Sequence, residues 1–134
     1  MANVVTVQTL HDGPAKAVVK VLFTIDTSNL AETVVVDPAT LMIDQGYSVV
    51  PNRVTIEALQ FAVDTRVALL LQWKATTNVD AYLCYDAAEV DFSGFGGLRN
   101  NAGAGITGQL VAITTGWTAG AVSGSAVIEV NKCN

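Results

Sequence analysis

Short runs of β-branched and other apolar residues follow one another along the whole chain, and Gly, Asn, Asp or Pro interrupts them at intervals of roughly 8–12 residues. Strand-length runs at this spacing are typical of an antiparallel sandwich or barrel. The runs occupy residues 4–10, 16–25, 32–36, 53–63, 66–74, 81–85, 89–92, 109–115 and 125–132. Asp37 and Pro38 suit the cap and first position of one short helix at residues 37–41. The sequence therefore predicts an all-β fold: one antiparallel, jelly-roll-like β-sandwich domain over residues 1–134, with at most that one short helix.

Alternation within the runs predicts which side chains face the core. In the run 16–25 the odd-numbered positions from 17 onward are all apolar, so this face should be buried. The apolar positions of the run 53–63 change parity near Ala58, which indicates a β-bulge or a strand that changes sheets. Residues 66–74 are apolar on both faces, as expected for a central strand.

Few charged residues are available to cover the surface of such a domain. Only 14% of the 134 residues are charged, against roughly 25% in an average soluble domain. Apolar residues make up 51% of the chain, and its mean hydropathy is +0.42. Large exposed apolar patches usually mark interfaces. We therefore expect part of the surface to meet another chain, although a surface rich in Ser, Thr, Asn and Gly is the alternative.

The charge balance argues against nucleic acid and membranes as partners. The formal net charge is −5, and the seven basic residues are scattered, whereas phosphate binding needs clustered Lys and Arg. The longest apolar run, residues 67–71, is far shorter than the ~20 residues of a spanning helix. The first residues resemble no secretory signal, so we expect synthesis and folding in a cytoplasm.

Motifs that would indicate catalysis are missing or lack their structural context. Residues 103–108 match the G-x-G-x-x-G string, but a β-branched strand follows them instead of a helix, so a flexible loop is the better interpretation. The single histidine, His11, lies beside Asp12 in a turn-like stretch, and no motif places a nucleophile near it. We expect no catalytic residue, no cofactor and no enzyme activity.

Acidic and sulfur side chains offer no regular ligand spacing either. Asp86, Glu89 and Asp91 could ligate Ca²⁺ through hard oxygens, but their spacing is not that of a calcium loop, so a solvated face is favoured and no metal is expected. Cys84 and Cys133 could form a disulfide, which the sequence cannot decide. In a reducing compartment, two free thiols are expected, with Cys84 buried and Cys133 exposed.

Candidate partner-binding residues come from one strand and two loops. Val4, Val5 and Val7 belong to the N-terminal run, and Phe95 and Leu98 belong to a glycine-rich loop at residues 94–108. Trp117 follows Gly116 in a second loop. A loop aromatic is a reasonable anchor for a partner or a sugar, and the equal alternative is a ring folded back over the end of the sandwich.

The chain resembles the cement, or decoration, proteins of tailed-phage capsids. The resemblance rests on the N-terminal segment 1–14 with its His11-Asp12-Gly13-Pro14 turn, the long strand 17–25 and the glycine-rich, low-charge C-terminal half. It implies a jelly roll or another β-sandwich without catalytic residues, forming a homodimer or homotrimer. The implied partner is the major capsid protein and the implied location is the outside of the virion, where such proteins hold the shell against genome pressure.

Two other functions are compatible with the same composition. A phage tail or head-fibre module would form rings or tubes by itself. A small carbohydrate-binding sandwich would use Trp117, Phe95 and the acidic residues with Ca²⁺. An enzyme would need a site built from carboxylates alone, because the sequence holds one histidine.

Overall fold

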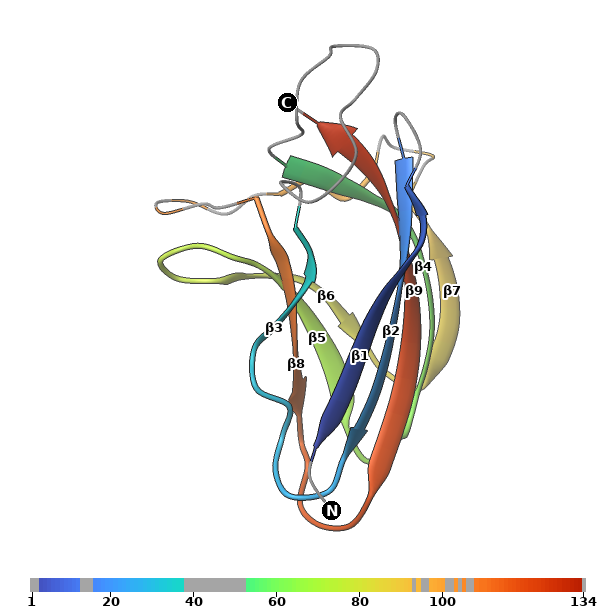
Figure 1. Ribbon diagram of the computed structural model, residues 1–134, viewed down its shortest axis with the longest axis vertical. Coiled ribbons are helices and arrows are strands. Elements are labelled where there is room, and N and C mark those ends of the chain that lie inside the picture. The colour runs from blue at the N-terminus through green and yellow to red at the C-terminus, as the bar shows by residue number, and fades with distance from the viewer. Residues whose placement is uncertain are drawn as a thin grey trace.

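The computed structural model describes residues 3–12, 16–37, 53–92, 94, 97–100, 103, 105 and 108–133. They form two antiparallel sheets packed face to face around the hydrophobic core (Figure 1). Sheet A has the order β1-β2-β9-β4-β7, with bounds Val4–Asp12, Lys16–Ile25, Val122–Cys133, Arg53–Val63 and Ala87–Asp91. Sheet B has the order β3-β8-β5-β6, with bounds Thr33–Val36, Leu110–Thr115, Ala68–Trp73 and Val79–Cys84.

This architecture confirms the all-β antiparallel sandwich. No α-helix occurs among the described residues, and none of them forms a helix that could cross a membrane. Of the short helix predicted at residues 37–41, only Asp37 is described, so the rest of that prediction lies outside the described residues.

The strand pairs are nested along the chain. β5 pairs with β6, β4 with β7, β3 with β8 and β2 with β9, each pair enclosing the previous one in sequence. The two sheets receive these pairs alternately, so the chain passes from one sheet to the other after β2 and after every later strand except β5. β1 is added outside this nest and pairs with β2 alone among the described strands.

The core lies between the two sheets, and strand alternation predicted its members well. All five odd-numbered positions from Ala17 to Ile25 on β2 are buried, as predicted. On β5, a central strand of sheet B, Leu69, Leu71 and Trp73 are fully buried. Burial of each such side chain stabilises the fold by about 1.5–3 kcal/mol.

A β-bulge lies where the apolar pattern of β4 changes parity. The register of β4 with β9 shifts between Ile56 and Ala58, so Glu57 is the extra residue. Both Ile56 and Leu59 consequently point into the core, although an odd number of steps separates them. The predicted bulge near Ala58 is confirmed.

The predicted turn at His11 is wrong, because β1 continues through it. A second register shift between Thr9 and His11 leaves Leu10 without a direct cross-strand neighbour. Pairing then resumes with His11 opposite Val18 and Asp12 opposite Ala17. The bulge absorbs the irregular step, so the polar residues extend the hairpin instead of ending it.

Candidate interaction surface

Four strands lie at sheet edges, and three of them carry features that discourage pairing with another chain. β3 has only four residues and a register shift, and β6 has a register shift beside Asp80. β7 has five residues, two of them the acids Glu89 and Asp91. Short length, bulges and charges are the usual means by which proteins protect sheet edges. These three edges are therefore poor templates for strand addition.

β1 is the fourth edge and lacks this protection along most of its length. It has nine residues, and none of those from Val4 to Leu10 is charged. Its pairing with β2 is regular from Val4 to Thr9, before the bulge. A long, regular and uncharged edge offers unpaired backbone groups to an additional strand.

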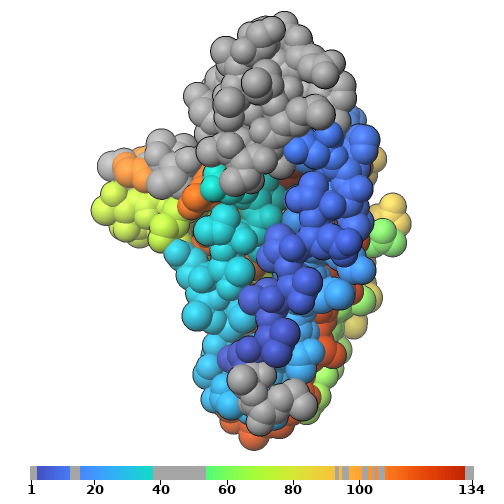
Figure 2. Space-filling model, viewed as in Figure 1, coloured from blue at the N-terminus to red at the C-terminus, as the bar shows by residue number. Residues whose placement is uncertain are grey.

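Exposed apolar side chains gather at this same edge. Of the seven large hydrophobic residues that are exposed in the described part of the chain, four belong to β1 and its neighbour β2: Val4, Val7, Leu10 and Leu22. Val34, Leu83 and Tyr85 are the others, and they lie at separate edges or ends of sheet B. Figure 2 shows the side chains of β1, in dark blue, as a continuous band across the surface.

The outer face of sheet A is divided by charge along its strands. Directly opposite residues share a face of a sheet, so the pairing registers define rows of outward side chains. Within the paired strands, the two rows at the lower end in Figure 1 contain no charged residue; we call them the uncharged patch. Its members are Val4, Thr6, Leu22, Thr24, Ala62, Ala87, Ser123 and Ser125.

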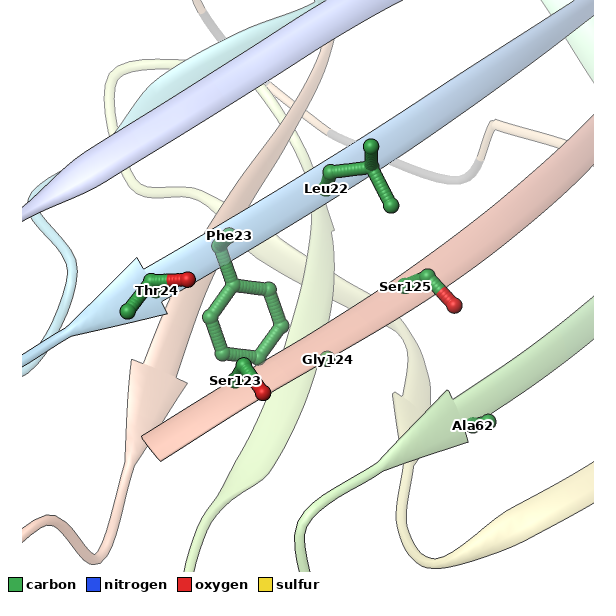
Figure 3. Close-up of a pocket in the computed structure, with 7 residues that line it drawn as sticks. All are labelled: Leu22, Phe23, Thr24, Ala62, Ser123, Gly124 and Ser125. Atoms are coloured by element: carbon green, nitrogen blue, oxygen red, sulfur yellow. The ribbon is translucent and has the colours of Figure 1, made fainter. Parts of the chain in front are cut away.

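The uncharged patch is hollowed where β2, β9 and β4 run side by side. A shallow depression of about 420 Å³ is lined by Leu22, Phe23, Thr24, Ala62, Ser123, Gly124 and Ser125 (Figure 3). It is an open depression rather than a closed pocket. It forms because the side chains on β9 and β4 are smaller than those of Leu22 and Thr24 beside them on β2. A hollow with alkyl and hydroxyl groups and no charge suits an uncharged side chain of a partner.

The upper part of the same face is charged and internally paired. The Lys16 ammonium lies 2.7 Å from a Glu57 carboxylate oxygen and 3.5 Å from one of Glu129. The hydrogen bond to Glu57 is the main cause that raises the pKa of Lys16. Asn131 also donates to Glu57 through its side-chain amide. This end is a partly exposed ion-pair network, in contrast to the uncharged patch.

A polar network also crosses sheet B. Lys74 lies 2.5 Å from Glu32, and the Asn78 amide donates to the other oxygen of Glu32. The hydrogen bond from Lys74, followed by that from Asn78, lowers the pKa of Glu32. These contacts join the start of β3 to the β5–β6 hairpin across β8, whose Val111 is fully buried. The polar side chains of this part of sheet B therefore bind one another across β8.

The structure separates the predicted partner-binding residues into two groups. Val4 and Val7 are exposed on β1, whereas Val5, opposite Phe23, is half-buried and packs against the core. Leu98 also packs against the core, and its backbone pairs with Ile56 through N–O distances of 2.7 and 3.0 Å. Phe95 lies outside the described residues.

Trp117 is folded back over the end of the sandwich. Its ring packs against the core, its indole N–H donates to the Gly120 carbonyl at 3.0 Å, and its backbone N–H donates to Asn29 Oδ1 at 3.1 Å. Of the two alternatives for this aromatic, the structure therefore has the ring turned inward.

The three acidic residues considered as calcium ligands have different structural roles. Asp86 has a φ of 62° and forms the turn between β6 and β7, where its carbonyl accepts the Val63 N–H at 2.6 Å. Glu89 and Asp91 are exposed on the outer face of β7. Among the residues that the structure describes, no group of three or more His, Cys, Asp or Glu could hold a metal ion.

Cys84 is buried and free, as predicted. Burial raises the pKa of its thiol to about 12, so the reactive thiolate is scarce at neutral pH. The side chain of Cys133 lies outside the described residues, and its predicted exposure remains a prediction.

Comparison with known proteins adds no family to this geometry. No protein-family model matches the chain, and no curated protein sequence matches it significantly. The surface features of β1 and sheet A are therefore the basis for assigning a function.

Proposed function

We propose that this chain is a non-enzymatic structural protein of a virion. It binds the outside of an icosahedral phage capsid as a homo-oligomer and stabilises contacts between major capsid protein subunits, in the manner of a cement protein. The single observation that carries the proposal is the gathering of uncharged, exposed surface at the free edge β1 and the uncharged patch beside it. The resemblance of the sequence to capsid decoration proteins supplies the partner.

The physical demands on a cement protein match this surface. It must cover a large, repetitive shell with many copies, so each contact is allowed to be modest while the assembled layer is stable. Docking through the uncharged patch buries alkyl and hydroxyl groups without the cost of desolvating a charge. The ion pairs around Lys16 lie at the other end of sheet A, away from the docked surface.

We also infer that the sandwich is a jelly roll. A jelly roll contains eight strands in two sheets, wound as two Greek keys. Support comes from the nested pairing of β2 through β9 and from the orders β2-β9-β4-β7 and β3-β8-β5-β6. β1 is then an addition to the edge of the roll.

Rate-zonal sedimentation of a lysate from the native source tests the function directly. We expect the chain to sediment with particles of megadalton size, at a fixed ratio to a major shell protein. Recovery only in the small-protein fractions contradicts the proposal. Rings or tubes formed by this chain alone point instead to a tail or fibre module.

A pair of matched variants tests which surface binds. Leu22→Glu places a carboxylate in the uncharged patch, and we expect it to weaken binding to capsids that lack this protein at least about tenfold. Leu83→Glu makes the same change at an exposed position of sheet B and should bind like the wild type. Equal binding by both variants would show that the uncharged patch does not contact the shell.

A further inference from the structure

β1 pairs with one strand, β2, and no other described strand pairs with its opposite side. In an antiparallel strand that is paired on one side only, alternate residues direct their N–H and C=O groups away from the sheet. The regular stretch from Val4 to Thr9 thus presents a row of donors and acceptors that no described strand pairs. We propose that a second copy of this chain occupies this edge, through antiparallel β1–β1 pairing about a twofold axis.

Symmetry limits how two β1 strands pair. In an antiparallel ladder, neighbouring residue pairs alternate between hydrogen-bonded and non-hydrogen-bonded types. A twofold axis must map each pair onto an equivalent pair, so one residue of β1 has to lie opposite its own copy. With Val7 at the axis, Val5 lies opposite Thr9 and Thr6 opposite Gln8. This register overlaps the whole uncharged segment from Val4 to Leu10.

Charge favours β1 over the other edges for self-pairing. The chain carries a net charge of −5, so two copies repel each other on average. No acidic residue lies between Val4 and His11, whereas Glu89 and Asp91 line the opposite edge of sheet A on β7. Pairing through β1 places the acidic edges of the two copies far apart and brings no like charges into contact along the strand.

The exposure of core-facing side chains on β1 supports a second strand beside it. Val5, Val7 and Thr9 lie opposite the inward residues Phe23, Val21 and Val19, so they share the core-facing side of sheet A. Val7 is nevertheless 38% exposed, because β1 pairs only with β2 at the margin of the sandwich. A second β1 extends this side with the same β-branched residues, which pack well as cross-strand neighbours.

The result is a dimer in which the two five-stranded A sheets join into one continuous sheet. Its uncharged patches lie on the outer face, beside the new junction, because Val4 and Thr6 belong to both the patch and β1. The inference deepens the homo-oligomer of the proposed function by naming its interface.

Sedimentation velocity of the purified full-length chain over a range of concentrations tests the pairing. We expect a monomer–dimer equilibrium for the wild type. Val7→Lys buries two ammonium groups at the axis and should raise the dissociation constant at least about a hundredfold. Leu83→Lys is the matched control at the edge strand β6 and should leave the constant unchanged. Circular dichroism establishes that each variant is folded, and Thr6→Lys replaces Val7→Lys if the latter does not fold.

Hydrogen exchange on dilute and concentrated protein locates the interface. The open-edge amides between Val4 and Thr9 should exchange more slowly at high concentration, with no such change on β7. A wild type that stays monomeric at about 1 mM, or folded β1 variants that still dimerise normally, overturns the proposal. Long filaments overturn it too, because they indicate head-to-tail pairing of β1 with β7. None of these results depends on capsids, so the pairing and the shell-binding function fail separately.

Discussion

Gly124 is an inward-facing position on β9 that leaves no room for a side chain. A Cβ atom there would lie 2.7 and 2.8 Å from two ring carbons of Phe23 and 3.2 Å from the Val63 Cα. The ring of Phe23 lies against β9 at this point (Figure 3). We expect Gly124→Ala to lower the free energy of unfolding by about 1–3 kcal/mol, because the buried ring must move out of its place. Urea denaturation measures the loss.

The neighbouring residue provides the control for this prediction. Ser123 points outward and is exposed, so Ser123→Ala should change the free energy of unfolding by no more than about 0.5 kcal/mol. An unchanged urea midpoint for Gly124→Ala would mean that Phe23 has free space on another side.

Single side chains were predictable where one strand defines a complete face. The buried face of β2 followed from alternation alone, because every second residue from Ala17 to Ile25 is apolar. Val5 was assigned to partner binding, but it packs on the core. The sequence does not reveal the register of β1 with β2, which places Val5 opposite the inward residue Phe23. The inward position of Trp117 depends on Asn29, which is 88 residues away in the chain.

At the scale of elements, one ion pair secures the crossing from β4 in sheet A to β5 in sheet B. Asp64 accepts hydrogen bonds from the Arg66 backbone at 3.0 Å and from its guanidinium at 2.8 and 3.1 Å. The same guanidinium donates to the Ala121 carbonyl at 2.8 Å, just before β9. Chiefly through its side-chain hydrogen bonds, Arg66 lowers the pKa of Asp64 from 3.8 to about 2.

This depressed pKa gives the pair a defined pH dependence. A carboxyl group whose pKa is lower in the folded state stabilises the fold above its unfolded pKa and loses that contribution as the pH falls through the folded value. We therefore expect Asp64→Asn to have a lower Tm than the wild type near neutral pH. The difference should stay constant down to about pH 4 and then shrink toward pH 2.

Thermal unfolding followed by circular dichroism from pH 7 to pH 2 checks this expectation. Glu89→Gln is the control, because it removes an exposed carboxylate on β7 that takes no part in the turn. When both the wild type and Asp64→Asn carry this substitution, the difference between their Tm values should be unchanged. A difference that does not depend on pH would show that the Asp64 carboxylate contributes only by its shape.

Elements were predictable because their signals are local. Period-two alternation and turn residues placed all nine strands of the described residues within a few positions, and the parity change on β4 revealed its bulge. His11 was assigned to a turn because polar residues occur both in turns and at the ends of hairpin strands. Only its pairing with Val18, which the sequence does not reveal, places it in β1. The protection of β3, β6 and β7 could not be predicted, because an edge strand is defined by its neighbours in space.

At the scale of the whole molecule, the fold depends on pairings that the sequence does not indicate. β2 and β9 lie side by side although Lys16 and its partner Asn131 stand at opposite ends of the chain. The uncharged patch combines five strands from distant segments, so no local window contains it. Long-range pairing of this kind must close large loops before it gains contacts, which makes folding slow.

The same topology predicts which terminal strand the molecule needs. β9 lies between β2 and β4 and contributes buried residues such as Ala126, Ile128 and Val130. β1 pairs only with β2, and within it Val5 is the residue that packs on the core among those described. Removing β1 leaves all four nested pairs intact, whereas removing β9 separates β2 from β4 in the middle of sheet A.

We therefore expect a chain without residues 2–12 to fold into the remaining eight strands. It should unfold cooperatively in urea, with a free energy of unfolding about 1–3 kcal/mol lower, because the apolar contact of Val5 is lost. A chain that ends at residue 120 should lack a cooperative transition, since the inward faces of β2 and β4 lose their common neighbour. Loss of cooperative unfolding on removal of β1 would show instead that this edge strand is part of the core. Its exposed valines would then be needed for folding as well as for binding a partner.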